Sequence, residues 1–385
     1  MGIDVDQEFV ISTLQRLVQI DSRNPNMTSD GPGEAEIGQF VAGTLEDLGL
    51  EVHVHYLAPN RVNVVGILKG CGEGKALLLN GHMDTVGVEG MEDPFSGTIR
   101  RGRLYGRGSQ DMKGSLAAML GAVKAVVEGQ DNLAGELIFA AVADEEDRSL
   151  GTQELVKAYQ ADAAIVTEPT DMEVVCAHRG LIWYQVETFG KAAHGSRYQE
   201  GVDAITRMGR FLVELDDLER KLPCRDPHPL TGPPSLHASL IEGGTDICTY
   251  PACCTLKIDR RTVPGEREKD VTGELQAIID RLTEEDETFR AEIKLLVQRP
   301  ALETSTKTEI LNVVQKAFTK QMGHPPHITG AAYWSDAALL AQVGMDAVLL
   351  GPVGRGLHSE EEWVDLKSVH DLAQVLTEAI INYCK

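Results

Sequence analysis

The sequence predicts an α/β protein in which a mixed, mostly parallel sheet covered by helices forms the main domain, with a smaller α+β domain inserted into it. In the first part of the chain, short apolar runs of strand length alternate with segments of helical periodicity, which is typical of a parallel sheet covered on both faces. From residue 178 the predicted order changes to strand-helix-strand-strand-helix-strand. The length of 385 residues also exceeds what one hydrophobic core usually supports. We therefore predict a main domain over residues 1–177 and 297–385 and an inserted domain over residues 178–296.

The composition is that of a soluble globular protein, with 42% hydrophobic and 25% charged residues. The formal net charge of -23 argues against nucleic acid and membranes as partners, because both select basic surfaces. Seven cysteines without a CxxC pair indicate neither a disulfide framework nor a thiolate zinc site. Residues 1–7 lack an apolar signal core, and no apolar stretch is long enough to cross a membrane. We therefore expect a reduced, cytoplasmic setting.

The elements of the main domain follow from the spacing of apolar residues. Helical spacing predicts helices over residues 6–20 and 35–48, and the second ends at Gly49, a residue typical of helix C-termini. Residues 70–75 are predicted to form a hairpin-type loop, and they lack the Ser or Thr and the following helix that a phosphate-binding loop requires. The other predicted elements up to residue 167 are strands over 52–56, 61–68, 76–79, 136–143 and 163–167 and helices over 115–128 and 151–159.

The inserted domain is predicted as an open-faced, ferredoxin-like sandwich because two helices alternate with four strands. Its strands cover residues 181–189, 235–242, 253–261 and 291–298, and its helices cover 202–222 and 267–282. The chain then returns to the main domain with a helix over 306–322, a buried strand over 346–350, a glycine loop to residue 356 and a final helix over 366–383.

A polar motif follows the predicted strand that ends at residue 79. Asn80 and Gly81 are a turn signal, and they are followed by His82 and Asp84. A histidine at this place reaches the crevice above the strand ends, where open α/β sheets bind their ligands. Asp84 is close enough in sequence to accept a hydrogen bond from the ring nitrogen of His82 that does not bind metal, which would set the tautomer. A polar turn after a buried strand explains these residues equally well when they are taken alone.

Side chains that can bind metal recur at similar places along the chain. Two imidazoles and three carboxylates lie at the ends of predicted strands or before a predicted helix. This donor set suits zinc, cobalt or manganese. If one carboxylate bridges, five ligands suffice for two ions about 3.5–4 Å apart. The glycine-flanked Asp111 is the best bridging candidate, and Glu145 is then available as a general base. The five candidate ligands are His82, Asp111, Glu146, Glu168 and His358.

Together, these motifs resemble those of the dinuclear-zinc amidohydrolases, a family that contains acetylornithine deacetylase, succinyl-diaminopimelate desuccinylase, aminoacylase and glutamate-releasing carboxypeptidases. The resemblance covers nearly the whole chain. It rests on residues 81–86 (Gly-His-Met-Asp-Thr-Val), 106–114, 144–146 (Asp-Glu-Glu), 167–169 (Thr-Glu-Pro) and 358–362.

The resemblance implies a role for each candidate ligand. In the family, the residues that match His82 and Glu168 bind one metal ion. Those that match Glu146 and His358 bind the other ion, and the residue that matches Asp111 bridges the two.

Two further residues of the motifs match catalytic positions. Asp84 corresponds to the family's orienting aspartate, and Glu145 corresponds to its general base. The main domain would then be the metal-binding catalytic domain. The inserted domain would be the family's lid, through which most members dimerise.

Substrate-binding residues are implied in the same way. The motif that ends at His194 is similar to the one whose histidine reaches across the dimer to the scissile carbonyl oxygen. Arg261 matches an arginine that grips a substrate carboxylate, a task suited to a bidentate guanidinium. The loop that contains Gly351 and Gly354 resembles a glycine loop that presents backbone N–H groups to the same carboxylate.

One position departs from the family pattern. Cys248 stands within residues 243–251, where the family has an asparagine that helps to bind substrate. This leaves the metal ligands intact, but the resemblance then implies neither the usual substrate contact nor the identity of the substrate.

The resemblance implies a metal-dependent hydrolase of N-acyl amino acids, of the deacetylase or desuccinylase type, acting in amino-acid metabolism. We expect two divalent ions, most simply zinc with cobalt or manganese as alternatives, and a homodimer. A dipeptidase or carboxypeptidase of the same family is the alternative. A non-catalytic binding protein would be expected to lack a ligand or the base, and all six positions are filled here. A dinucleotide-dependent dehydrogenase is disfavoured because no GxGxxG opens a helix after the first strand.

Overall fold

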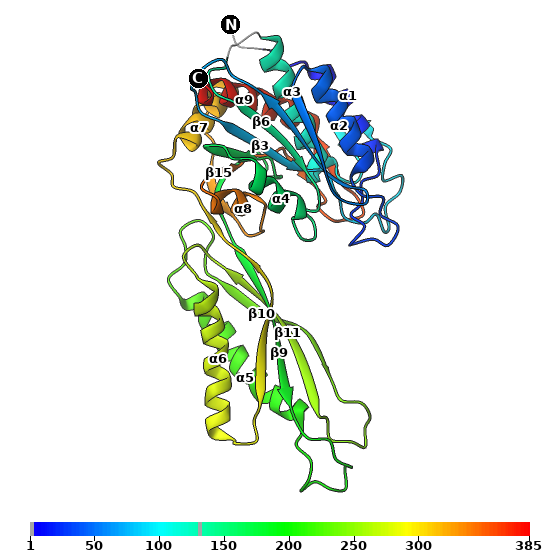
Figure 1. Ribbon diagram of the computed structural model, residues 1–385, viewed down its shortest axis with the longest axis vertical. Helices are drawn as coiled ribbons and strands as arrows, with labels where there is room; N and C mark the ends of the chain where they lie inside the picture. Colours follow the sequence, from blue (N-terminus) through cyan, green and yellow to red (C-terminus); the bar gives the residue numbers. More distant parts are fainter. Residues whose placement is uncertain (1–3, 130–132) are drawn as a thin grey trace. The chain divides into compact units, whose positions relative to one another are not determined.

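The computed structural model describes residues 4–129 and 133–385 of the chain (Figure 1). Residues 1–3 and 130–132, which fall in the first range predicted for the main domain, lie outside the described residues. The chain divides into two compact units that both contain helices and strands, and the predicted fold class is confirmed. The first unit comprises Met1–Cys176, Thr304–Thr329 and Ser335–Lys385, and the second comprises Ala177–Glu303 and Gly330–Trp334.

A mixed, mostly parallel sheet forms the centre of the first unit. In spatial order its strands are β1 (Glu51–Ala58), β2 (Arg61–Leu68), β6 (Leu137–Val142), β3 (Leu77–His82), β7 (Ala163–Val166), β15 (Asp346–Leu349), β8 (Val174–His178) and β13 (Leu302–Glu303). A further strand, β14 (Ile328–Ala331), also pairs with β8. The four middle strands, β6, β3, β7 and β15, run parallel to one another. β3, β6 and β7 are buried along their whole length, which explains their continuous apolar sequences.

The connection over residues 70–75 differs from its predicted form. It joins β2 to β3, but β6 lies between these two strands in the sheet, so the connection is not a hairpin. The strand β6 comes from a later part of the chain, and the local loop sequence gives no sign that it inserts there.

Helices pack on both faces of the central sheet (Figure 1). Leu77 and Leu79 of β3 join one hydrophobic core with α1 (Gln7–Gln19), α2 (Ala35–Asp47), α3 (Gly114–Glu128), α7 (Glu309–Met322) and α9 (Leu366–Tyr383). Leu78 points to the opposite face, because strand side chains alternate, and it is also fully buried. On that face, α4 (Leu150–Ala158) contacts β6 and α8 (Ala337–Gln342) contacts β7.

Individual residues determine where these helices end and how closely they pack. Asp6 caps α1 by accepting a hydrogen bond from the N–H group of Phe9 (3.0 Å). Gly49 follows α2 with a φ of 85°, in the left-handed conformation typical of the glycine that ends a helix. Gly121 lets α3 approach α1, because a Cβ atom at this position would lie 2.4 Å from Cγ2 of Val10.

The second unit contains a four-stranded antiparallel sheet with two helices on one face. In spatial order its strands are β10 (Ser235–Gly243), β11 (Cys253–Thr262), β9 (Gly180–Phe189) and β12 (Ala291–Arg299), and its helices are α5 (Ala204–Lys221) and α6 (Glu268–Glu285). Tyr184 of β9 is buried in the core beneath the helices, whereas its neighbour Trp183 is exposed. This is the open-faced arrangement expected from the order of elements.

A small antiparallel sheet in the first unit was not predicted. Its strands, in spatial order, are β16 (Gly354–Arg355), β17 (Trp363–Asp365), β5 (Arg103–Tyr105) and β4 (Thr98–Arg100). Each is too short to show an apolar period in the sequence. The pairing of Tyr105 with Trp363 brings the turn before α3 beside the segment that contains His358.

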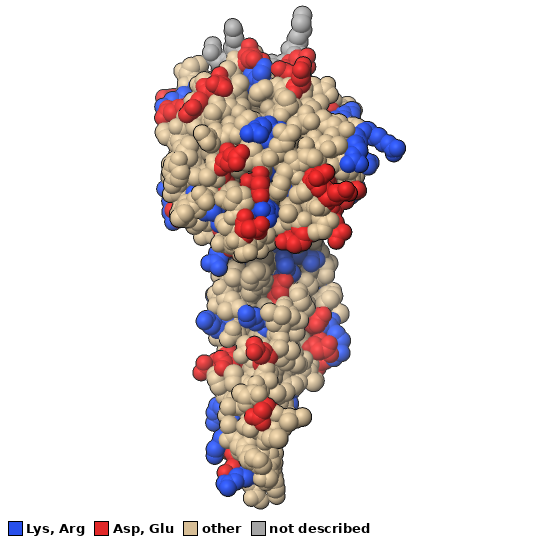
Figure 2. All heavy atoms as spheres, turned by 90° about the vertical axis from the view of Figure 1, so that its right-hand side faces the viewer, with Lys and Arg blue, Asp and Glu red and all other residues tan. Residues whose placement is uncertain are grey.

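One face of the molecule shows charged side chains of both signs (Figure 2). On the face drawn in Figure 2, acidic and basic side chains are interspersed, which is typical of a solvated surface. Among residues 4–129 and 133–385, no helix is both long enough and apolar enough to cross a membrane.

Candidate metal centre

The predicted metal ligands follow the ends of neighbouring strands. His82 is the last residue of β3, Glu146 follows β6 and Glu168 follows β7. These strands run parallel, with β3 between the other two, so their carboxyl ends meet at one edge of the sheet. Asp111 lies in the turn before α3, and His358 lies in the loop between β16 and β17. The structure therefore draws the candidates from five separate segments.

The five side chains are linked by polar contacts. Nε2 of His82 lies 3.0 Å from Oδ1 of Asp111 and 4.0 Å from Oε1 of Glu168. Nε2 of His358 lies 3.6 Å from Oδ2 of Asp111 and 3.2 Å from Oε2 of Glu146. Asp111 thus presents one oxygen to each histidine, which is the placement required of a carboxylate that bridges two ions.

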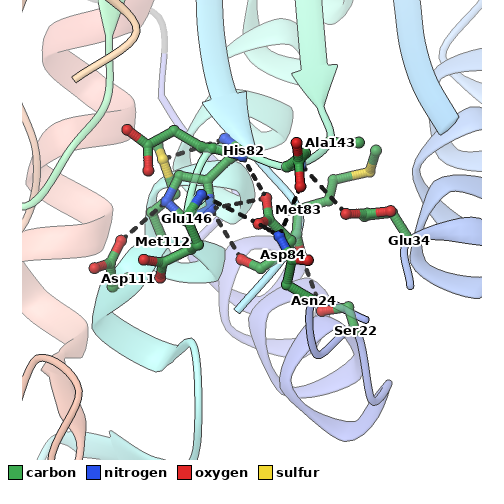
Figure 3. Close-up of polar contacts among 12 residues, drawn as sticks. Ser22, Asn24, Glu34, His82, Met83, Asp84, Asp111, Met112, Ala143 and Glu146 are labelled. Atoms are coloured by element: carbon green, nitrogen blue, oxygen red, sulfur yellow. Dashed lines mark hydrogen bonds and ion pairs between the residues drawn. The ribbon is translucent and has the colours of Figure 1, made fainter. Parts of the chain in front are cut away.

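The donor atoms form two overlapping groups. Those of His82, Glu145 and Glu168 lie within 4.8 Å of one another, and so do those of His82, Asp111 and Glu146. Figure 3 shows His82 between Asp111 on one side and Asp84 on the other. Because the first group contains Glu145, the predicted base lies beside the predicted ligands His82 and Glu168.

The electrostatics of the cluster fit a bound cation. Burial raises the pKa of Glu145 well above its usual value and that of Glu168 to about 8. Burial and the charge of Asp111 raise the pKa of Glu146, while hydrogen bonds to Asp111 and Glu146 raise that of His358 to about 10. Buried carboxylates that repel one another are stabilised by a divalent cation, and this mixed donor set suits zinc. The residues present therefore fit a metal centre that holds two ions.

The second ring nitrogen of His82 has a different partner from the predicted one. Nδ1 lies 2.9 Å from the backbone carbonyl oxygen of Asp84, whereas the Asp84 carboxylate lies 3.6 Å away. That carboxylate instead accepts hydrogen bonds from the backbone N–H groups of Glu145 (3.1 Å) and Glu146 (3.2 Å). Asp84 therefore contacts His82 through its backbone and the base-bearing segment through its side chain.

A buried polar network surrounds Asp84 on the side away from His82 (Figure 3). The Asn24 amide donates to the carboxylates of Asp84 (2.8 Å) and Asp144 (3.0 Å). Arg61 donates to Asp144 (2.6 Å) and to Glu34 (2.7 Å). Burial and the charge of Asp84 raise the pKa of Glu34 to about 7, although Arg61 opposes this rise. The network holds the segment that leads into Glu145 and Glu146.

Sequence reasoning missed this network and one further carboxylate. Asp336 is 1% exposed, accepts a hydrogen bond from Thr152 (2.6 Å), and its charge helps to raise the pKa values of Glu145 and Glu168. Asn24, Arg61 and Asp336 come from distant segments with no shared spacing, and the polar character of residues 22–33 was the only local signal.

The glycine loop after β15 packs tightly against other segments of the first unit. The N–H group of Gly351 donates to Oγ1 of Thr170 (2.9 Å), so it does not offer a donor to a substrate as predicted. A Cβ atom at Gly351 would lie 1.9 Å from the carbonyl oxygen of Glu168, and one at Gly354 would lie 2.6 Å from Cγ of Gln110. These glycines allow the loop to pack directly against two ligand-bearing segments.

The remaining predicted site residues lie in the second unit. His194 is exposed, with Nδ1 2.9 Å from Oγ of Ser196. Arg261 is partly exposed and donates from Nε to Asp259 (3.0 Å), which holds its guanidinium. Cys248 is exposed, and its carbonyl oxygen accepts a hydrogen bond from the residue that follows His194 (2.7 Å). The backbone therefore joins the segments of His194 and Cys248.

A family model and several known proteins match most of the chain. Residues 78–382 match the model of peptidase family M20/M25/M40. The chain is 30% identical to acetylornithine deacetylase of Myxococcus xanthus, and the match covers 97% of each chain. It is 29% identical to N-formyl-4-amino-5-aminomethyl-2-methylpyrimidine deformylase of Bacillus subtilis (strain 168), over 90% of this chain and 89% of the relative.

Solved structures share the fold. The YXEP protein of Bacillus subtilis, described as a dinuclear metal binding peptidase from the M20 family, superposes with a TM-score of 0.77 at 15% identity, covering 98% of each chain. At this identity the likeness shows the fold alone. The family match over residues 78–382, with the acetylornithine deacetylase relative at 30% identity, establishes that the chain belongs to peptidase family M20/M25/M40 and is a metal-dependent hydrolase.

Proposed function

We propose that the protein removes an acyl group from the amino nitrogen of an N-acyl amino acid. The observation that carries this proposal is the convergence of five ligand-type side chains and Glu145 at one edge of the sheet. Two relatives support the acyl substrate, because the names of both, an acetylornithine deacetylase and a formyl-pyrimidine deformylase, describe the loss of a small acyl group from nitrogen.

Two divalent ions, most simply zinc, would be held by the five ligands, with cobalt and manganese suited to the same donor set. His82 and Glu168 would hold one ion, and Glu146 and His358 the other. The orientation of the two Asp111 oxygens toward the two histidines supports a bridging role for Asp111. When bound, such ions polarise a carbonyl group and lower the pKa of water.

Glu145 is the proposed general base and then general acid. It would take a proton from the attacking water and deliver it to the leaving nitrogen, as one positioned carboxylate can do in both steps. Its burial supports this role, because a carboxylate removed from bulk water exchanges protons with the substrate instead of the solvent. Asp84 would keep Glu145 in place through the hydrogen bond to its N–H group.

The second unit would serve as the lid and dimerisation domain, as the resemblance implies. Arg261 would bind the substrate carboxylate, and Asp259 supports this role by holding the guanidinium. His194 would donate to the scissile carbonyl oxygen of the neighbouring chain of a homodimer, and its exposure supports a role outside its own unit. Cys248 would replace the usual asparagine contact. We place the enzyme in the cytoplasm, in agreement with a cysteine pattern that indicates no disulfide framework.

A dipeptidase or carboxypeptidase activity is the second candidate. It is supported by the structural likeness to a dinuclear metal binding peptidase. The same ligands, base and carboxylate-binding arginine would serve both substrates, since a dipeptide is itself an amino acid with an acylated nitrogen. The two candidates differ only in the group on the acyl side.

The test is hydrolysis of a matched panel by protein that has been stripped of metal and then loaded with zinc. The panel holds one amino acid constant and varies the acyl group among formyl, acetyl, succinyl and glycyl. We expect the first three to be cleaved with higher kcat/KM than the glycyl dipeptide, and a Glu145→Gln control to be inactive on all four. A preference for the dipeptide would support the second candidate, and no cleavage of any member would refute both.

A further inference from the structure

Glu362 is a buried carboxylate whose partners all lie in the segment that carries Asp111. Its side chain is 1% exposed. Oε1 accepts hydrogen bonds from the backbone N–H groups of Gln110 (2.8 Å) and Asp111 (3.1 Å). Oε2 accepts one from the N–H group of Gly108 (2.9 Å). One carboxylate therefore fixes three backbone positions of the turn before α3, including that of the proposed bridging ligand itself.

Arg107 completes this arrangement from the same turn. Its side chain is 3% exposed, and the guanidinium donates from Nη1 to Oε2 of Glu362 (2.7 Å). It also donates from Nη2 to the carbonyl oxygen of Ser359 (2.9 Å) and from Nε to that of Gly87 (2.7 Å). The fork of the guanidinium thus joins Gly87 to the segment of Ser359 and Glu362, which follows His358 directly.

The backbone of His358 needs such support. Its φ of 58° lies in the left-handed region, which residues other than glycine rarely adopt. A conformation of this kind persists only where surrounding contacts hold it. The hydrogen bond from Arg107 to the next carbonyl group, that of Ser359, is one of those contacts.

The neighbouring strands place Glu362 where it can act on both ligands. Tyr105 pairs with Trp363 in the small sheet, and the N–H group of Gly106 donates to the carbonyl oxygen of Glu362 (3.1 Å). This pairing sets Glu362 directly beside the turn that contains Asp111. A buried, charged carboxylate must be fully hydrogen-bonded, and four donors meet that requirement here.

We propose that Glu362 and Arg107 are positioning residues for the metal centre, which hold Asp111 and His358 at the separation that two ions require. This inference rests on the proposed function, in which both residues are metal ligands. Neither Glu362 nor Arg107 is one of the five proposed ligands. Partners of this kind around metal ligands set the metal affinity, because they fix where the ligand atoms stand before the metal arrives.

A purely structural role would have a different consequence. In that case, loss of Glu362 would make the whole protein less stable, and the molecules that remain folded would bind metal as before. The two roles are therefore separated by the metal affinity of folded protein, measured apart from its thermal stability.

The experiment is a titration of metal-free protein with Co²⁺, followed by the visible absorption of the bound ion and by a competing chelator. The variants are Glu362→Gln and its neighbour Glu361→Gln, an exposed carboxylate that serves as the matched control. We expect two equivalents to bind to the parent and to Glu361→Gln. In Glu362→Gln, one amide N–H₂ group must face a backbone N–H donor. We therefore expect at least one equivalent to bind about 10–100-fold more weakly, with an altered absorption spectrum.

A second variant keeps the test decisive if Glu362→Gln does not fold. Arg107→Lys retains the charge opposite Glu362, but a single ammonium group cannot reach the oxygens of Glu362, Ser359 and Gly87 together. We expect it also to weaken Co²⁺ binding. Unchanged Co²⁺ affinity in whichever of these variants is folded, as shown by circular dichroism, would overturn the inference. Binding of fewer than two equivalents by the parent would instead count against the proposed function.

Discussion

The side-chain amide of Asn24 donates a hydrogen bond to Oδ2 of Asp84 across 2.8 Å, with both residues fully buried. The same amide reaches Asp144 at 3.0 Å, so it lies between two carboxylates that would otherwise repel each other. Asp84 in turn accepts hydrogen bonds from the N–H groups of Glu145 and Glu146. The Asn24 amide therefore helps to hold the segment that carries the proposed base.

We therefore expect Asn24→Ala to reduce both stability and turnover. Loss of a hydrogen bond to a charged group costs about 1.5–3 kcal/mol, which should appear in the free energy of unfolding from urea titration. Turnover should fall about 10–100-fold, as for other partners that orient active-site groups. Asn26→Ala is the control, because Asn26 is exposed and its closer contact is the surface residue Asp147 (3.0 Å). Equal effects of the two substitutions would contradict this role.

The metal assignment predicts unequal effects for two ligands. Asp111→Ala should empty both positions, because its two oxygens face both histidines. Glu168→Ala should mainly weaken the position near His82. Elemental analysis after gel filtration would give the ions per chain, and chelator treatment of the parent should abolish activity that added zinc restores. An Asp111→Ala protein with two ions would refute the bridge.

The role of the base predicts a selective loss of turnover. Glu145→Gln keeps the size of the side chain and cannot accept the proton, so it should retain metal and substrate binding. Its kcat should fall by about 10²–10⁴, the usual contribution of a positioned base. Single-turnover kinetics and elemental analysis would check this, with Glu146→Gln as the comparison. If Glu145→Gln lost metal and Glu146→Gln kept it, the two roles would have to be exchanged.

The substrate anchor predicts a preference for a free carboxylate. Arg261, held by Asp259, would form a charged hydrogen-bonded contact worth about 1.5–3 kcal/mol, or roughly a 10–150-fold change in kcat/KM. Esterified or amidated substrates should show this loss in the parent, and Arg261→Met should remove the difference between acid and ester. Equal rates for acid and ester in the parent enzyme would argue against an amino-acid substrate.

The proposed service of His194 to a neighbouring chain predicts complementation. A His194→Ala dimer and a Glu145→Ala dimer should both be nearly inactive. After subunit exchange, each mixed dimer would contain one site with an intact base and an intact histidine, so random mixing should restore about a quarter of the parent activity. Exchange would be verified with a fluorescent label on one variant. No recovery despite exchange would show that His194 does not act in trans.

The sequence alone was sufficient for the fold class, the family and metal-dependent hydrolysis. The buried strand β3 shows as a continuous apolar run because both of its faces are covered. His82 and Glu168 are recognisable because each follows such a run, at the place where parallel strands end together. Signals of this kind are local, since they depend on the spacing of residues within one element.

The contacts that hold the site could not be predicted from the spacing of residues within one element. The small sheet that pairs Tyr105 with Trp363 consists of strands too short to show a period. Asn24 and Glu362 reach their partners across 60 or more positions of the chain, so no local spacing marks them. In the sequence alone, a polar residue that becomes buried cannot be distinguished from one that stays exposed.

His82 and Asp84 illustrate both what the sequence determines and what only the tertiary structure decides. Their spacing of two residues determined that Asp84 would lie beside the imidazole. Which Asp84 oxygen meets the ring was decided by β6, which lies next to β3 and brings the N–H groups of Glu145 and Glu146 within reach of the carboxylate. Two partly buried N–H groups take the carboxylate as their acceptor, and the backbone carbonyl group is left for the histidine.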